Sequence, residues 1–299
     1  MWNKIFLILI ASQLFFRGAL PAQNSHTPKP KIYPRPPVYG IPAKTLPKGK
    51  LIYRSYFTFS DYTRMINPEK TAMISLPKGL NFRSYSYTPK LRYGLTNRIT
   101  LIANFPLYFK QMKNNGNTKT GVGPGDAVLA LLYRFHYNKP GKFLISGLLF
   151  TKYPTGKSSH LATGDLPLGS GTYDAGLALM PEKEFGKLDV RASVLYIFRS
   201  RNAQNSDLGN VQLFSLSTAF NFSKNFITEA TILYKSSANN KTDGEIVPGS
   251  NTFMTQFIIG AQYRLAPTLL IQAAVPVTLT AKVPFQSWYD IWLGVFYLM

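Results

Sequence analysis

Apolar and polar residues alternate along this chain with a period of two, in twelve segments that follow one another from Leu51 to the C-terminus. Successive side chains of a β-strand point to opposite faces, so the alternation predicts strands with one apolar and one polar face. Most segments are longer than the roughly five or six residues of a soluble strand and match a tilted bilayer crossing. A soluble sandwich would alternate in the same way, so the connections have to decide between the two folds.

The connections between the segments are short and long in strict alternation. The predicted strands are 51–61, 82–95, 98–110, 125–137, 142–153, 171–180, 187–199, 211–222, 226–238, 252–264, 268–281 and 288–299. Tight turns are expected at 96–97, 138–141, 181–186, 223–225 and 266–267, and longer loops at 62–81, 111–124, 154–170, 200–210, 239–251 and 282–287. Short periplasmic turns, longer outer loops and an even strand number predict an all-β fold, a transmembrane antiparallel up-and-down β-barrel of the bacterial outer membrane with both termini in the periplasm.

Residues 1–22 have the features of a secretory signal peptide. Lys4 supplies a positive charge, an apolar run extends from Ile5 to Phe16, and cleavage is expected after Ala22. The alternative, an uncleaved anchor helix, needs about twenty apolar residues. Arg17 interrupts the run too early for that.

Residues 23–50 form a proline-rich basic arm before the predicted barrel, 51–299. Proline lacks the backbone donor of a β-ladder, so an extended polyproline-like conformation outside the sheet is expected. Three interpretations follow from this composition. The arm is a disordered periplasmic linker, it contacts a periplasmic partner, or it folds back towards the mouth of the barrel.

The chain contains no cysteine, which excludes disulfides, thiolate metal sites and a lipoprotein anchor. Its 34 basic and 13 acidic residues give a formal charge of +21. Secretion argues against nucleic acid as the partner of this charge. Membrane lipid and the phosphates of lipopolysaccharide are the expected partners, through loop residues Lys113, Lys119 and Lys157 or as solvated loop charge.

The residues give no indication of an enzyme or of a cofactor site. The three histidines are His26 in the arm, His136 near the end of a strand and His160 in a predicted loop, and no hydrolase signature surrounds them. No cluster of carboxylates and histidines predicts a metal site.

Charged residues on the polar faces are expected to line the lumen. The candidate residues facing the lumen or a solute are Arg54, Lys90, Arg92, Arg134, Asp174, Arg191, Glu229 and Arg264. Glu229 and Arg264 lie on neighbouring predicted strands and are expected to pair. Arg92 and Arg134 have no obvious acidic neighbour, so one hypothesis places them at an inner constriction that favours anions, and the other assigns them to structural packing.

Two signatures precede the fifth strand: Leu91–Ile99 contains LRYGLTNRI, and Gly121–Asp126 reads GVGPGD. Tyr153–Gly156 (YPTG) and Leu168–Asp174 (LGSGTYD) follow. Together these motifs resemble the outer-membrane transporters named after the meta-pathway of phenol degradation, over about Leu91 to Leu179. The resemblance implies a barrel for uptake of small, often hydrophobic molecules, and it implies no catalytic or binding residues.

The predicted function is passage of small molecules, hydrophobic or anionic, through an outer-membrane barrel. Two alternatives remain from the sequence. One is a closed barrel with a structural or envelope-interaction role, and the other is a lipid-modifying enzyme.

Overall fold

The computed structural model of the protein describes residues 37–38, 40, 42–67, 69, 72–158, 164–202 and 205–299. The predicted signal peptide and the first part of the arm lie outside these residues. No helix in the described part of the chain is long and apolar enough to cross a membrane.

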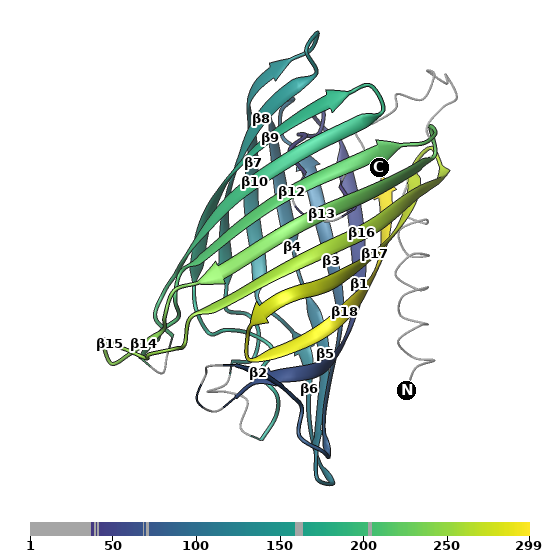
Figure 1. The fold of residues 1–299 in the computed structure, drawn as a ribbon. Helices are drawn as coiled ribbons and strands as arrows, with labels where there is room; N and C mark the ends of the chain where they lie inside the picture. The colour runs from purple at the N-terminus through teal and green to yellow at the C-terminus, as the bar shows by residue number, and fades with distance from the viewer. Residues whose placement is uncertain are drawn as a thin grey trace. The chain divides into compact units, whose positions relative to one another are not determined.

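The described strands close into an antiparallel barrel (Figure 1). Twelve strand positions form the wall, because β4 continues as β5 and β6 as β7, and β1 pairs with both β3 and β18. The wall strands are β1 (Leu51–Ile66), β3 (Leu80–Gly94), β4 (Ile99–Asn104), β5 (Leu107–Asn114), β6 (Asn117–Pro124), β7 (Ala127–Asn138), β8 (Phe143–Tyr153), β9 (Asp174–Phe185), β10 (Leu188–Arg199), β12 (Val211–Asn221), β13 (Phe226–Ser237), β16 (Thr252–Ala266), β17 (Leu269–Lys282) and β18 (Phe285–Leu298). Short strands in the loops are β2 (Met73–Ser75), β11 (Ser206–Asp207), β14 (Lys241–Thr242) and β15 (Glu245–Ile246). The predicted twelve-stranded barrel is confirmed.

The two faces of the wall differ in polarity as the alternation predicts. On β10, Val194 and Phe198 are exposed outwards, whereas Ser193 is buried inside. On β18, Tyr289 and Leu293 are exposed outwards in the same way. An apolar outer face around a polar interior suits a wall that meets lipid on one side.

The two ends of the barrel differ in their connections. We call the end at which every connection is short the turn end. The opposite end, which carries the long connections as well as the short β5–β6 and β17–β18 connections, is the loop end. The backbone N–H of Met299 donates to Leu51 O (2.9 Å), so the start of β1 and the end of β18 meet at the turn end.

Several predicted boundaries are corrected by the structure. Residues 62–66 belong to β1 and residues 285–287 to β18 rather than to loops. Residues 111–124 form most of the β5–β6 hairpin rather than a loop, because Asn115 and Gly116 both adopt positive φ (46° and 88°) and allow a two-residue turn. Residues 181–185 belong to β9 rather than to a turn. Pro181 is tolerated there because the β9–β10 ladder has no pairs between Glu182↔Arg191 and Leu179↔Val194.

Candidate functional site: the barrel lumen

Part of the proline-rich arm lies inside the barrel. We call residues 37, 38, 40 and 42–48 the lumenal segment. Val38, Ala43 and Leu46 retain 3%, 1% and 2% of their exposure. Of the three interpretations of the arm, the structure of these residues agrees with the one in which the arm folds back towards the barrel. The residues lie in the lumen itself.

The lumenal segment packs on two separate parts of the wall. Val38 lies in an apolar cluster with residues of β13, β16 and β17, namely Leu233, Ile258 and Ala274. Ala43 lies in a second cluster formed by β4 and β7 to β10, namely Ile102, Leu132, Leu144, Leu148, Ala178, Met180 and Leu195. Because these strands belong to different parts of the closed wall, the segment crosses the lumen.

Polar side chains of the wall bind the backbone of the lumenal segment. Arg54 Nη2 donates to the carbonyls of Pro37 (2.8 Å) and Val38 (2.9 Å), and Arg92 Nη2 donates to Lys44 O (2.9 Å). In addition, Ser146 Oγ donates to Ala43 O (2.6 Å). The segment supplies no ladder strand, so these side chains satisfy carbonyls that would otherwise be buried without donors.

An ion-pair cluster holds Lys44 against β9. Its ammonium lies 2.8 Å from Glu182 Oε1 and 2.6 Å from Glu184 Oε1. Burial alone lowers the pKa of Lys44, but the charges and hydrogen bonds of Glu182 and Glu184 outweigh burial and raise the pKa above its ordinary value. Lys44 therefore stays charged at neutral pH. It neutralises Glu182, which is 3% exposed.

The predicted lumen residues have different surroundings. Arg54, Arg92, Asp174 and Glu229 are buried. Glu229 Oε2 pairs with Arg191 Nη2 at 2.5 Å and accepts from the backbone N–H of Val38 at 3.0 Å.

The predicted pairing of Glu229 with Arg264 is wrong in its register. Glu229 lies opposite Gly260, four residues from Arg264. Arg264 Nη1 donates instead to Pro267 O at the turn end (2.8 Å). The sequence predicted the neighbouring strands correctly but not which residues on them face each other.

Arg92 and Arg134 both lie towards the turn end, but each binds a backbone carbonyl. Arg134 Nη2 donates to Asn97 O at 2.9 Å, and the same carbonyl accepts from Thr45 Oγ1 of the lumenal segment. Their predicted role at an anion-selective constriction stays a prediction.

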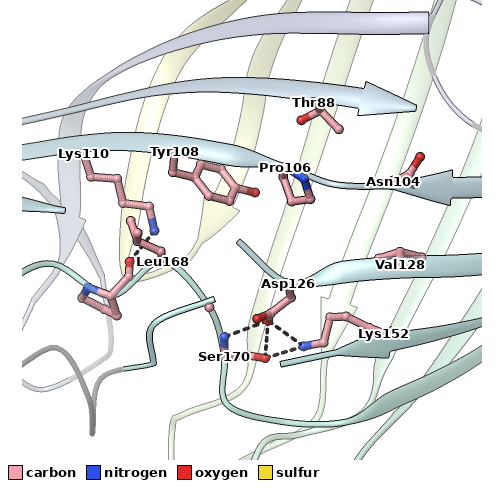
Figure 2. A pocket seen from close by; sticks show the side chains of 12 residues that line it. Thr88, Asn104, Pro106, Tyr108, Lys110, Asp126, Val128, Lys152, Leu168 and Ser170 are labelled. Carbon is pink, nitrogen blue, oxygen red and sulfur yellow. Dashed lines mark hydrogen bonds and ion pairs between the residues drawn. The ribbon is translucent and has the colours of Figure 1, made fainter. Parts of the chain in front are cut away.

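A pocket of about 550 Å³ lies in the loop half of the lumen (Figure 2). Residues of β3, β4, β5, β7 and β8, together with Pro106 and Asp126 between strands, form its wall, and residues 167–170 of the loop before β9 close one side. Its lining residues are Thr88, Asn104, Pro106, Tyr108, Lys110, Asp126, Val128, Lys152, Pro167, Leu168, Gly169 and Ser170. The volume is that of a site for a small molecule.

Asp126 fastens this loop to the wall. Its carboxylate accepts from Ser170 N and Ser170 Oγ, both at 2.9 Å, and lies 3.3 Å from Lys152 Nζ. Lys152 also donates to Ser170 Oγ (Figure 2). In addition, Lys152 pairs with Asp174 at 2.7 Å. The Lys152 ammonium thus lies between the carboxylates of Asp126 and Asp174, and Asp126 also binds the loop backbone at Ser170. These contacts hold the loop folded inwards against the wall.

Glycines allow the loop to approach the wall this closely. A Cβ on Gly156 would lie 2.9 Å from Gly169 Cα, and a Cβ on Gly169 would overlap Asp126. The glycine-based motifs of the sequence therefore converge on one site. Sequence reasoning missed Ser170 and Lys44 as site residues, although the LGSGTYD motif that contains Ser170 was a signal for one of them.

Asp126→Asn is expected to lower the free energy of unfolding by about 2–3 kcal/mol, because it removes a buried charge that Lys152 and Ser170 both use. Urea-dependent unfolding in lipid vesicles measures this change. Asp61→Asn is the matched control. Its ion pair with Arg83 is more than 40% exposed on both sides, so a loss below about 1 kcal/mol is expected. Equal losses for the two variants would contradict the assigned role of Asp126.

The histidines do not form a catalytic arrangement in the described part of the chain. His136 is exposed near the turn end, with its ring 6.1 Å from that of Phe143, and no hydrogen bond joins it to a described serine. His26 and His160 lie outside the described residues.

A closed twelve-stranded barrel with an apolar outer face and a charged lumen defines the class of outer-membrane β-barrel proteins. The family model described as "Putative MetA-pathway of phenol degradation" matches residues 76–292, and the chain therefore belongs to this family. This confirms the resemblance seen in the glycine motifs.

Two solved structures show the same kind of fold. An outer membrane channel from Pseudomonas putida F1 is similar with a TM-score of 0.74 and 17% identity, over 86% of this chain and 98% of that chain. The NanC porin is similar with a TM-score of 0.50 and 11% identity, over 83% of this chain and 98% of that chain. No curated protein matches the chain.

Proposed function

We propose that this protein is a narrow channel for small molecules in the bacterial outer membrane, with the turn end and both termini in the periplasm. The observation that carries the proposal is the pocket of about 550 Å³ in a polar lumen inside an apolar wall. A barrel with a purely structural role needs no such space. The family and the likeness to an outer membrane channel support the same function.

The lumenal segment favours a second candidate, a closed barrel with a structural or envelope-interaction role. Its apolar contacts and its hydrogen bonds to Arg54, Arg92 and Ser146 fill part of the lumen. In the channel proposal this segment narrows the path. In the closed-barrel proposal it blocks the path permanently.

Planar lipid bilayers distinguish the two candidates. Purified full-length mature protein is expected to give discrete steps of ionic current if it is a channel. Absence of current from correctly folded protein, verified by its heat-dependent migration in gels, would contradict the channel proposal and leave the closed barrel.

Lipopolysaccharide is the proposed partner of the loop end. Lys113 and Lys119 are exposed on the β5–β6 hairpin, where they can meet phosphate groups. Lys157 is less available, because its ammonium pairs with Asp165 at 2.9 Å.

A further inference from the structure

Three basic side chains gather on neighbouring positions of β1 and β3. Arg54 lies opposite Lys90 in the register, and Arg92 follows two residues later on the same face of β3. The cationic groups of Arg54 and Lys90 both lie over the ring of Tyr56. The Arg54 Cζ lies 4.1 Å and the Lys90 Nζ 5.7 Å from the centroid of Tyr56. Two cations are thereby concentrated in one place.

The described carboxylates do not neutralise this cluster. Glu229 acts on Arg54 electrostatically, but its carboxylate is bound to Arg191 and Val38 N. No described carboxylate lies within 4.0 Å of Arg54, Lys90 or Arg92. Cations in a low-dielectric lumen without a counter-charge are costly, so the cluster suits a bound anion.

The arginine side chains retain unused donors. Arg54 and Arg92 are 2% and 3% exposed, and each uses Nη2 to hold the lumenal segment. The Nε of each is buried and has no hydrogen-bond partner among the described residues. Lys90 donates no hydrogen bond to any described residue, and the contact that its ammonium makes is with the ring of Tyr56.

The cluster lies next to the pocket in the loop half. Thr88 and Asn104 line that pocket; Thr88 precedes Lys90 by two residues on the same face, and Asn104 lies opposite Lys90 on β4. Tyr56, which the Lys90 ammonium approaches, lies opposite Thr88. The ammonium is therefore directed towards the loop end on the β1 side of β3, next to Thr88, which lines the pocket. Asn104 lines the pocket, and its amide Nδ2 is a donor that can reach a carboxylate there.

The rest of the pocket is suited to an apolar group. Pro106, Tyr108, Val128 and Leu168 contribute apolar surface. Of the two lysines in the lining, Lys152 is neutralised by Asp126 and Asp174, and the ammonium of Lys110 donates to Pro167 O at 2.7 Å. The positive charge of Lys90 lies near one end of the pocket, and the apolar lining residues lie further towards the loop end. This arrangement suits a ligand that has an anionic group at one end and an apolar body.

We propose that the lumen binds a small organic carboxylate, with the carboxylate at Lys90 and Asn104 and the apolar body against Tyr108, Val128 and Leu168. The site would give the channel a preference for such anions, and to that extent it rests on the proposed channel function. Binding itself is measurable without any current.

Trp292 provides the readout, because its ring packs edge-on against Tyr56 at 5.8 Å. In a Trp288→Phe background it is the only tryptophan after the predicted signal peptide. The full mature chain in detergent is titrated with benzoate and, separately, with neutral benzamide. Benzoate is expected to change Trp292 fluorescence with saturation and benzamide to bind at least about tenfold more weakly, the factor that 1.4 kcal/mol corresponds to.

Lys90→Met keeps the length of the side chain and removes its charge, and it is expected to weaken benzoate binding at least about tenfold. Lys113→Met, on the exposed hairpin, is the matched control and should leave the affinity unchanged. Equal binding of benzoate and benzamide, an unchanged affinity in Lys90→Met, or no benzoate binding at all would each overturn the proposed site. Current steps in bilayers would then still support the channel, whereas charge-dependent binding without current would support the site and contradict the channel.

Discussion

Deletion of residues 23–48 is expected to raise the single-channel conductance several-fold. The lumenal segment crosses the lumen between two clusters of the wall, and Val38, Ala43 and Leu46 are almost fully buried there. Ions have to pass through the part of the lumen's cross-section that the segment does not fill. Removing it opens an interior that side chains alone fill less completely in a twelve-stranded barrel than in an eight-stranded one.

The measurement is current through planar bilayers under fixed salt and voltage, for the wild type and the deletion variant. A folding control is needed because Arg54 and Arg92 lose the carbonyls that they bind. The barrel should still migrate as a folded species in gels without heating. An unchanged conductance of folded deletion protein would mean that the segment does not limit the path.

The barrel could be predicted from the sequence because its signal repeats in every strand. The alternation predicted that Val194, Phe198 and Ile259 face outwards, and all three are exposed. It also predicted that Arg54 and Glu229 face the lumen, and both are buried there. Turn chemistry was harder to interpret. Asn115 and Gly116 form the two-residue turn of a hairpin in a stretch whose polar composition predicts a loop. Pro181 predicts a turn, although it lies in β9.

The position of the arm could not be predicted, since several of the hydrogen bonds that hold it go to its backbone and carry no residue-specific signal. Arg54, Arg92 and Ser146 bind backbone carbonyls of the lumenal segment, and any residue supplies a carbonyl. Proline-rich composition shows only that the segment stays out of the sheet. The pocket could not be predicted either. Gly156 and Gly169 belong to motifs that the sequence analysis singled out, but their close approach is visible only in the structure.

Lys44→Met is expected to release the lumenal segment in part and to shift the barrel towards a more conductive state. The substitution leaves Glu182, 3% exposed, without its cation. Breaking a fully buried pair costs about 3–5 kcal/mol; Lys44 retains 23% exposure, so about 2 kcal/mol is appropriate here. That free energy corresponds to a change of about 30-fold in the ratio of closed to open states, measured as open probability in bilayers.

Lys48→Met is the matched control for this prediction. Lys48 belongs to the same segment, but its side chain is exposed and forms no ion pair with a described residue, so its open probability should equal that of the wild type. If Lys48→Met opens the channel as much as Lys44→Met, the general charge of the arm rather than the Glu182 pair holds it in place.

The pH dependence of the wild type provides an independent test of the same ion pair. The pKa of Lys44 is raised in the folded protein, so its stabilising contribution is fully present below the ordinary pKa of lysine and is lost as the pH rises through the raised value. Between neutral and alkaline pH, wild-type open probability should therefore increase only once the solution is strongly alkaline. Lys44→Met should lack this alkaline step and already be more open at neutral pH, because methionine has no proton to lose. An alkaline step of the same size in both proteins would assign it to another group and contradict the role of Lys44 as the fastening of the lumenal segment.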